Sequence, residues 1–159
     1  MQKFERADFE VQEYVESENY GKFVLSPLER GFGTTIGNAL RRVLLSSLPG
    51  AAVFSIKVDG VYHEFTSIPG VREDVSMIIL QLKQLVMKIE DDEVYTLQIS
   101  AKGPCTITAG DIICPAQVEV INKDLEIAHL EKDVTLEMEL KAKNGRGYIS
   151  ADLNKQLKQ

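Results

Sequence analysis

LERGFGTTIGNALRRVLLSSLPGAAV, residues 28–53, holds the clearest helix pattern in this chain of 159 residues. Threonines at the start of residues 34–48 can cap a helix, and Pro49 with Gly50 supplies a stop. At about 100° per residue, one face of that helix is apolar and consists of Ile36, Leu40, Val43 and Leu44. The stretch therefore predicts a helix over 34–48 that packs its apolar stripe against a sheet.

The opposite side of this helix carries one large apolar residue among polar ones. Leu45 lies beside Arg41 and Arg42, away from the stripe. A single exposed leucine is common on soluble proteins and needs no partner. A helix with two partners would show the same pattern, so both interpretations stay open.

Strand patterns lie on both sides of the helix. Residues 20–25 end in an apolar run before Pro27, whereas the charged residues before position 20 are only weakly patterned. Residues 53–58 alternate in polarity, and Asp59-Gly60 is typical of a hairpin turn. This turn predicts a returning strand over 61–65.

Beyond this point the chain predicts one more helix and then mostly strands. Pro69-Gly70 opens a second helical pattern whose apolar residues recur at intervals of four and three: Val71, Val75, Ile78, Leu82 and Leu85. The period then changes to two, with short strands expected at 87–89, 95–99, 105–108, 118–121, around Ile127 and at 134–142. The predicted class is α+β with antiparallel sheet.

Charge and composition exclude several classes of function. The 24 acidic residues outnumber the 18 basic ones, and a net charge of −6 does not suit a protein that binds duplex phosphates. Residues 21–50 carry +3 and residues 51–140 carry −9, which supports a boundary near residue 50. The start lacks a secretory pattern, and no apolar run approaches the roughly 20 residues that cross a bilayer. A cytoplasmic protein without membrane contact is expected.

The side chains that most often carry catalysis are few and scattered. His63 and His129 lie in no recognisable motif and are expected to be satisfied structural residues. Cys105 and Cys114 lack a histidine at zinc-ligand spacing; they could pair, but reduced apolar side chains are expected. The glycines after Arg30 lack the Gly-Lys-Ser/Thr ending of a phosphate loop. The sequence predicts no catalytic site, metal or cofactor.

Four stretches together resemble a known family. They are residues 28–53, VDGVYHEFTSIPGVREDV at 58–75, ILQLKQLVMKI at 79–89 and NGRGYISA at 144–151. In this order and spacing they resemble the bacterial DNA-directed RNA polymerase alpha subunit family, over nearly the whole chain. The resemblance implies that residues 1–50 form the first part of a dimerisation subdomain and residues 51–150 an inserted, mainly β subdomain with a helix near 70–85. Residues 151–159 would begin a return segment whose remainder is absent.

The resemblance also implies partners and roles. The chain would be a non-catalytic scaffold subunit of a nucleotidyltransferase, pairing with a second alpha chain and docking the beta and beta-prime subunits, without direct DNA contact. The dimerisation helix would use Ile36, Leu40, Val43 and Leu44. Contact with the beta subunit is expected from Arg41, Arg42, Leu45, His63, Glu64, Gly70, Val71 and Asp74, with Arg42 the best supported because a guanidinium can grip a carboxylate with two hydrogen bonds.

An alternative follows from the missing return segment. The layer that would bury the helix stripe is incomplete, and each uncovered large apolar side chain gives up about 1.5 to 3 kcal/mol of burial free energy. The alternative is therefore a free-standing α+β interaction module, or a fragment without function, that has lost dimerisation.

Overall fold

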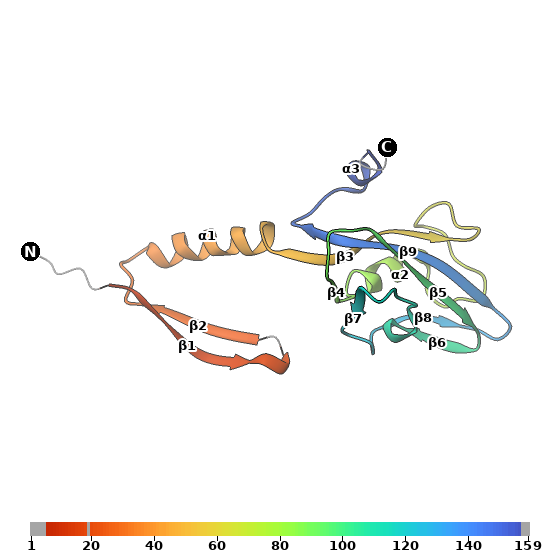
Figure 1. Cartoon of the computed structure of the whole chain (residues 1–159), viewed down its shortest axis with the longest axis horizontal. Helices are drawn as coiled ribbons and strands as arrows, with labels where there is room; N and C mark the ends of the chain where they lie inside the picture. Colours follow the sequence, from red (N-terminus) through yellow and green to blue (C-terminus); the bar gives the residue numbers. More distant parts are fainter. Residues whose placement is uncertain (1–5, 19, 157–159) are drawn as a thin grey trace, which may run out of the picture. The chain divides into compact units, whose positions relative to one another are not determined.

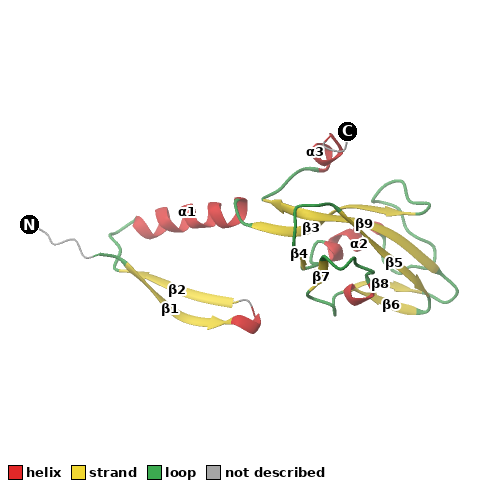
Figure 2. Cartoon of the chain, viewed as in Figure 1, coloured by secondary structure: helices red, strands yellow, loops and turns green. Residues whose placement is uncertain are grey.

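The computed structural model describes residues 6–18 and 20–156 and divides the chain into two compact units. Unit 1 is Met1–Ser47 and unit 2 is Leu48–Gln159. Residues 1–5, 19 and 157–159, which belong to the predicted first and last segments, lie outside the described residues. Helices and antiparallel strands occur together, which confirms the α+β class (Figures 1 and 2).

Unit 1 contains a hairpin and one long helix. Strand β1 (Asp8–Val15) pairs antiparallel with β2 (Tyr20–Ser26), and a 3-10 turn, η1 (Glu16–Glu18), lies between them. Strand β2 was predicted, but β1 was not. The register shifts between Val11 and Glu13, so a bulge interrupts the alternation on which a strand prediction depends.

Helix α1 (Phe32–Ser46) follows the hairpin close to its predicted place. It starts after Gly31, whose φ of 92° is a left-handed conformation that glycine adopts without strain. At its end the Ser47 N–H donates to the Val43 carbonyl over 2.9 Å. Pro49 and Gly50 then begin the next strand directly, with no turn of their own.

Unit 2 is built on a five-stranded antiparallel sheet with the order β5-β9-β3-β4-β7, and a separate two-stranded sheet pairs β6 with β8. The strands are β3 (Pro49–Val58), β4 (Met87–Ile89), β5 (Tyr95–Lys102), β6 (Cys105–Thr108), β7 (Val118–Val120), β8 (Glu126–Leu130) and β9 (Thr135–Arg146). The helices are α2 (Val75–Leu82), the 3-10 turn η2 (Ala109–Asp111) and the short α3 (Ala151–Gln156).

Strand β9 organises the large sheet because it pairs with β3 on one side and β5 on the other. Its alternation is the cleanest in the sequence, and the alternate residues Leu136, Met138, Leu140 and Ala142 are buried. The residues between them, including Glu137 and Lys141, face away from the core. One face of the sheet therefore serves the core and the other is polar.

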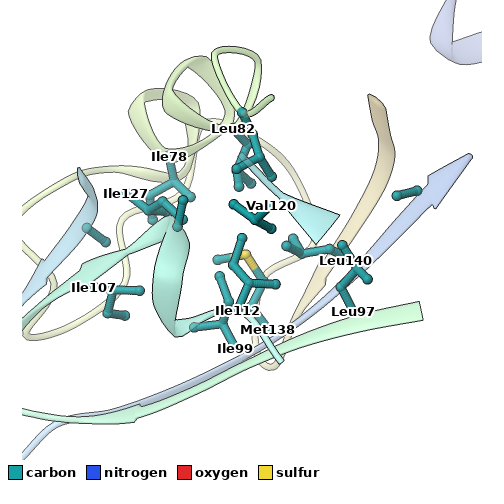
Figure 3. Close-up of a cluster of buried hydrophobic side chains, with 14 of the residues drawn as sticks. Ile78, Leu82, Leu97, Ile99, Ile107, Ile112, Val120, Ile127, Met138 and Leu140 are labelled. Atoms are coloured by element: carbon teal, nitrogen blue, oxygen red, sulfur yellow. The ribbon is translucent and has the colours of Figure 1, made fainter. Parts of the chain in front are cut away.

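The core of unit 2 lies between this sheet, helix α2 and the small sheet. Figure 3 shows Ile78 and Leu82 of α2 directed toward side chains that the strands contribute, among them Leu97 and Leu140. Ile78, Leu97 and Leu140 are fully buried. Such a continuous apolar cluster can stabilise unit 2 by itself.

Two predicted elements of unit 2 were wrong. Residues 61–65 form no strand: the turn at Gly60 is present, with φ of 78°, but β3 pairs with β9 and β4 instead of a local partner. Helix α2 begins at Val75, not at Gly70, because Val71 forms an antiparallel bridge with Leu130. All five apolar residues of the predicted helix pattern are nevertheless buried.

Candidate protein interaction site

The α1 stripe predicted for dimerisation is uncovered in unit 1. Leu40, Val43 and Leu44 are 57%, 54% and 58% exposed, and Ile36 is half-buried. No described residue of α1 is buried, so the described residues of unit 1 do not provide the expected sheet packing for this stripe. The stripe is therefore an apolar surface of the kind that protein partners cover.

The other side of α1 carries the predicted contact residues Arg41, Arg42 and Leu45. Leu45 is 63% exposed, so α1 presents large apolar side chains on two sides. Both arginine side chains are exposed, and neither forms an ion pair with any side chain that the structure describes. Their guanidinium groups are free to receive a carboxylate from another molecule.

The remaining predicted contact residues lie in unit 2, in the segment of residues 61–74, which we call the 61–74 loop. His63 and Glu64 are exposed near its start. The His63 ring nitrogen Nδ1 lies 3.1 Å from the Thr66 hydroxyl, and the Glu64 carbonyl accepts a 2.7 Å hydrogen bond from the Ser76 hydroxyl. The bond from Ser76 holds the backbone at Glu64 and leaves the Glu64 carboxylate in solvent.

Gly70 and Val71 tie the loop to strand β8. The Gly70 carbonyl accepts from the Glu131 N–H over 2.8 Å, and Val71 bridges Leu130 and is buried. Gly70 has φ of 75°, and a Cβ there would collide with the Val134 side chain. Both residues thus have a structural role in positioning the loop.

Asp74 caps helix α2, with its carboxylate Oδ1 accepting the Met77 N–H over 2.8 Å. Glu73, one residue earlier, makes two contacts with β8. Its Oε2 accepts the backbone N–H of His129 over 2.7 Å, and its Oε1 lies 2.7 Å from the His129 ring nitrogen Nδ1. A second carboxylate, Glu126, lies 3.7 Å from the other ring nitrogen. Sequence reasoning treated His129 as satisfied but gave it no partner.

The environment of Glu73 favours its ionised form. Burial opposes the charge and by itself raises the pKa, but the hydrogen bonds from the backbone and ring of His129 outweigh it, and the pKa of Glu73 is lowered. Glu73, His129 and neighbouring loop residues also line a shallow hollow with Ser67, Val71, Arg72, Asp74 and Met77. The carboxylate thus stays charged at neutral pH at the edge of an open surface.

Two exposed aromatic residues of the loop were missed. Tyr62 is 96% exposed and Phe65 is 80% exposed, and they flank His63 and Glu64. Exposed aromatic side chains are frequent anchors in protein interfaces. Both aromatic residues are visible in the sequence. They fell within the strand expected over 61–65, so they were interpreted as part of the fold and not as part of an interface.

No cluster of three or more His, Cys, Asp or Glu side chains suited to a metal ion occurs in the described parts of the chain. Cys105 and Cys114 are both free and half-buried, and burial raises the pKa of the Cys114 thiol.

Comparison with known proteins identifies the family of this chain. The sequence model of the RNA polymerase Rpb3/RpoA insert domain matches residues 56–159, which is more than half of the chain. The chain belongs to this family. Most of unit 2, with the 61–74 loop, β8 and β9, falls within the matched insert domain.

Curated relatives extend the similarity to unit 1. A protein of Alkaliphilus metalliredigens (strain QYMF) named DNA-directed RNA polymerase subunit alpha is 55% identical over 155 residues, covering 98% of this chain and 49% of the relative. Proteins of the same name from Desulfitobacterium hafniense (strain Y51) and Desulforudis audaxviator (strain MP104C) are 54% and 55% identical over the same length. The chain thus spans about half the length of the curated relatives it matches.

Among the described helices, none combines the length and the apolar character that a bilayer crossing requires.

Proposed function

We propose that this chain is a scaffold subunit of DNA-directed RNA polymerase, which pairs with a second copy of itself and docks the beta and beta-prime subunits. The observation that carries the proposal is the uncovered apolar stripe of α1, in a chain 55% identical over 98% of its length to a protein named DNA-directed RNA polymerase subunit alpha. Catalysis would belong to the large subunits. The expected site of action is the cytoplasm.

Dimerisation is supported by the energetics of the stripe. Leu40, Val43 and Leu44 are each more than half exposed, and covering the part that is still exposed yields about 1 to 2 kcal/mol apiece. A second copy of unit 1 presents the same stripe, and a two-fold interface brings like patches together. This role assigns residues 1–50, which include unit 1, to the first part of the dimerisation subdomain.

Docking of the beta subunit is supported by charge and exposure. Arg42 has no ionic partner among the described residues. A carboxylate of the beta subunit can accept two parallel hydrogen bonds from its guanidinium N–H groups. In unit 2 the exposed His63 and Glu64, flanked by Tyr62 and Phe65, form a second candidate contact. Aromatic anchors surrounded by polar groups are typical of interface centres.

The docking test is capture of the beta subunit by co-expressed full chain. Arg42→Ala is expected to lower recovery of the beta subunit about tenfold or more, since a desolvated charge pair loses one partner. Lys102→Ala, which removes an exposed cation from strand β5, is the matched control and should leave recovery unchanged. Equal recovery with Arg42→Ala and the unchanged chain would remove Arg42 from the interface.

The dimerisation test is size-exclusion chromatography with light scattering. The full chain is expected to elute as a dimer, and Leu44→Glu, which places a charge in the stripe, as a monomer. A folded monomer that also ignores the beta subunit would favour the free-standing interaction module. The identity across both units does not favour that alternative.

A further inference from the structure

The last residues of the 61–74 loop run beside strand β8 and make backbone contacts like those of a short additional strand. The Gly70 carbonyl accepts from Glu131, Val71 bridges Leu130, and the Arg72 N–H donates to the His129 carbonyl over 3.0 Å. A regular ladder would continue with a backbone carbonyl for the His129 N–H. Here the Glu73 carboxylate oxygen Oε2 accepts the His129 N–H instead, over 2.7 Å.

The second oxygen of Glu73 holds the His129 ring, so one side chain makes two contacts with one residue. The Nδ1 to Oε1 distance is 2.7 Å, and the Glu73 side chain is only 19% exposed. Hydrogen bonds that involve a charged partner are stronger than neutral ones, and two of them fix orientation as well as position. Glu126 is the other carboxylate near the ring, but it is 66% exposed and 3.7 Å away.

A short chain of bonds connects this contact to the exposed part of the loop. Glu73 directly precedes Asp74 and Val75, and the Val75 N–H donates to the Thr66 carbonyl over 3.1 Å. The next residue, Ser76, donates its hydroxyl to the Glu64 carbonyl. A displacement of Glu73 from β8 would therefore move the backbone that presents His63 and Glu64.

We propose that Glu73 and His129 are positioning residues that clamp the 61–74 loop onto β8 in the conformation that meets the beta subunit. This inference rests on the proposed function. The clamp itself makes no contact with the partner: it acts through the backbone of the loop. Glu73 was outside the set of contact residues that the sequence suggested, and the two-point contact with His129 is the reason to include it.

Three variants of the full chain test the clamp. Glu73→Ala removes both contacts, while Glu73→Gln keeps an oxygen that can accept the His129 N–H. Ile99→Val removes one buried methyl group from β5 and serves as the control for a general loss of stability. Affinity for the beta subunit is measured by biolayer interferometry, and thermal unfolding is followed for each variant.

Glu73→Ala is expected to weaken binding of the beta subunit about tenfold or more, with Glu73→Gln in between and Ile99→Val unchanged. The expected loss with Glu73→Ala exceeds what its change in melting temperature accounts for, as calibrated by Ile99→Val. A loss of affinity that simply follows stability across all variants would overturn the positioning role and leave Glu73 as an ordinary structural residue.

Hydrogen exchange on the chain alone separates this inference from the proposed function. In Glu73→Ala the amides of Arg72, Val75 and His129 should exchange about tenfold faster, while the amides of β9 keep their protection. Unchanged exchange at these three amides would overturn the clamp, whatever the beta subunit does. If the unchanged chain fails to bind the beta subunit, the proposed function fails, and the exchange result still decides whether the clamp exists.

Discussion

Units 1 and 2 use their apolar residues in opposite ways. In unit 2, large side chains such as Ile78, Leu97 and Leu140 are fully buried in one cluster. Among the described residues of unit 1 none is buried, and Phe9, Phe23 and Leu44 are each more than half exposed. A two-stranded hairpin and a lone helix are marginal by themselves. Unit 2 is thus stabilised from within, whereas unit 1 needs other protein to cover it.

The largest expected effect is on the core of unit 2. Leu140→Ala should lower the free energy of unfolding by about 2 to 5 kcal/mol, because the side chain is fully buried and a cavity would remain. Urea unfolding of the full chain measures this change. A loss below about 1 kcal/mol would show that the β9 layer contributes little to stability, and the contrast between the units would weaken.

A smaller effect is expected at Gly70, where the loop joins β8. Gly70→Ala should cost about 1 to 3 kcal/mol, because the new methyl group combines a left-handed φ with a collision against Val134. Gly60→Ala is the matched control, since Gly60 also has a positive φ but open space around its Cβ direction. Equal destabilisation by the two variants in urea would mean that the collision adds nothing.

The contribution of Glu73 should depend on pH. The pKa of Glu73 is lower in the folded chain than its ordinary value of 4.5, so the stabilisation is present above that value and is lost as the pH falls through the folded pKa. Near neutral pH, the free energy of unfolding of the unchanged chain should exceed that of Glu73→Gln by about 1 kcal/mol. Urea unfolding at a series of lower pH values should show that this difference in stability becomes smaller. A difference that stays constant with pH would contradict a contact made by the charged carboxylate.

The smallest effect on stability is expected in unit 1. Leu44→Ala should change the free energy of unfolding of the dissociated chain by less than about 0.5 kcal/mol, since the side chain is 58% exposed. The same substitution should weaken self-association, which sedimentation at several concentrations measures. A large loss of stability in the dilute chain would mean that the stripe is already covered within unit 1.

Local patterns predicted the elements that carry their own periodicity. Helix α1 and strands β2, β5 and β9 were found close to their predicted places, because capping residues, prolines and alternation act over a few neighbouring residues. Strand β1 was missed because its bulge breaks the alternation. The false strand over 61–65 came from a real turn at Gly60 whose following residues have no local partner.

The candidate site was predictable as a set of segments but not as an arrangement. The sequence pointed to the 61–74 loop through its resemblance to a family, and it described His129 as satisfied. The contact between Glu73 and His129 joins residues 56 positions apart, and no local pattern encodes such a pairing. Tyr62 and Phe65 were visible in the sequence, but only their exposure distinguishes interface aromatics from core ones.

The register of β3 against β9 has a consequence for modularity. Pro49 at the first position of β3 lies opposite Arg146 at the last position of β9, so the chain enters and leaves the large sheet at adjacent points. A module with neighbouring ends can be spliced into a loop of a host protein at little cost in chain entropy. The segment between these residues could therefore be transplanted into another protein or replaced as one unit. The distance between the two points where it joins the rest of the chain would stay the same.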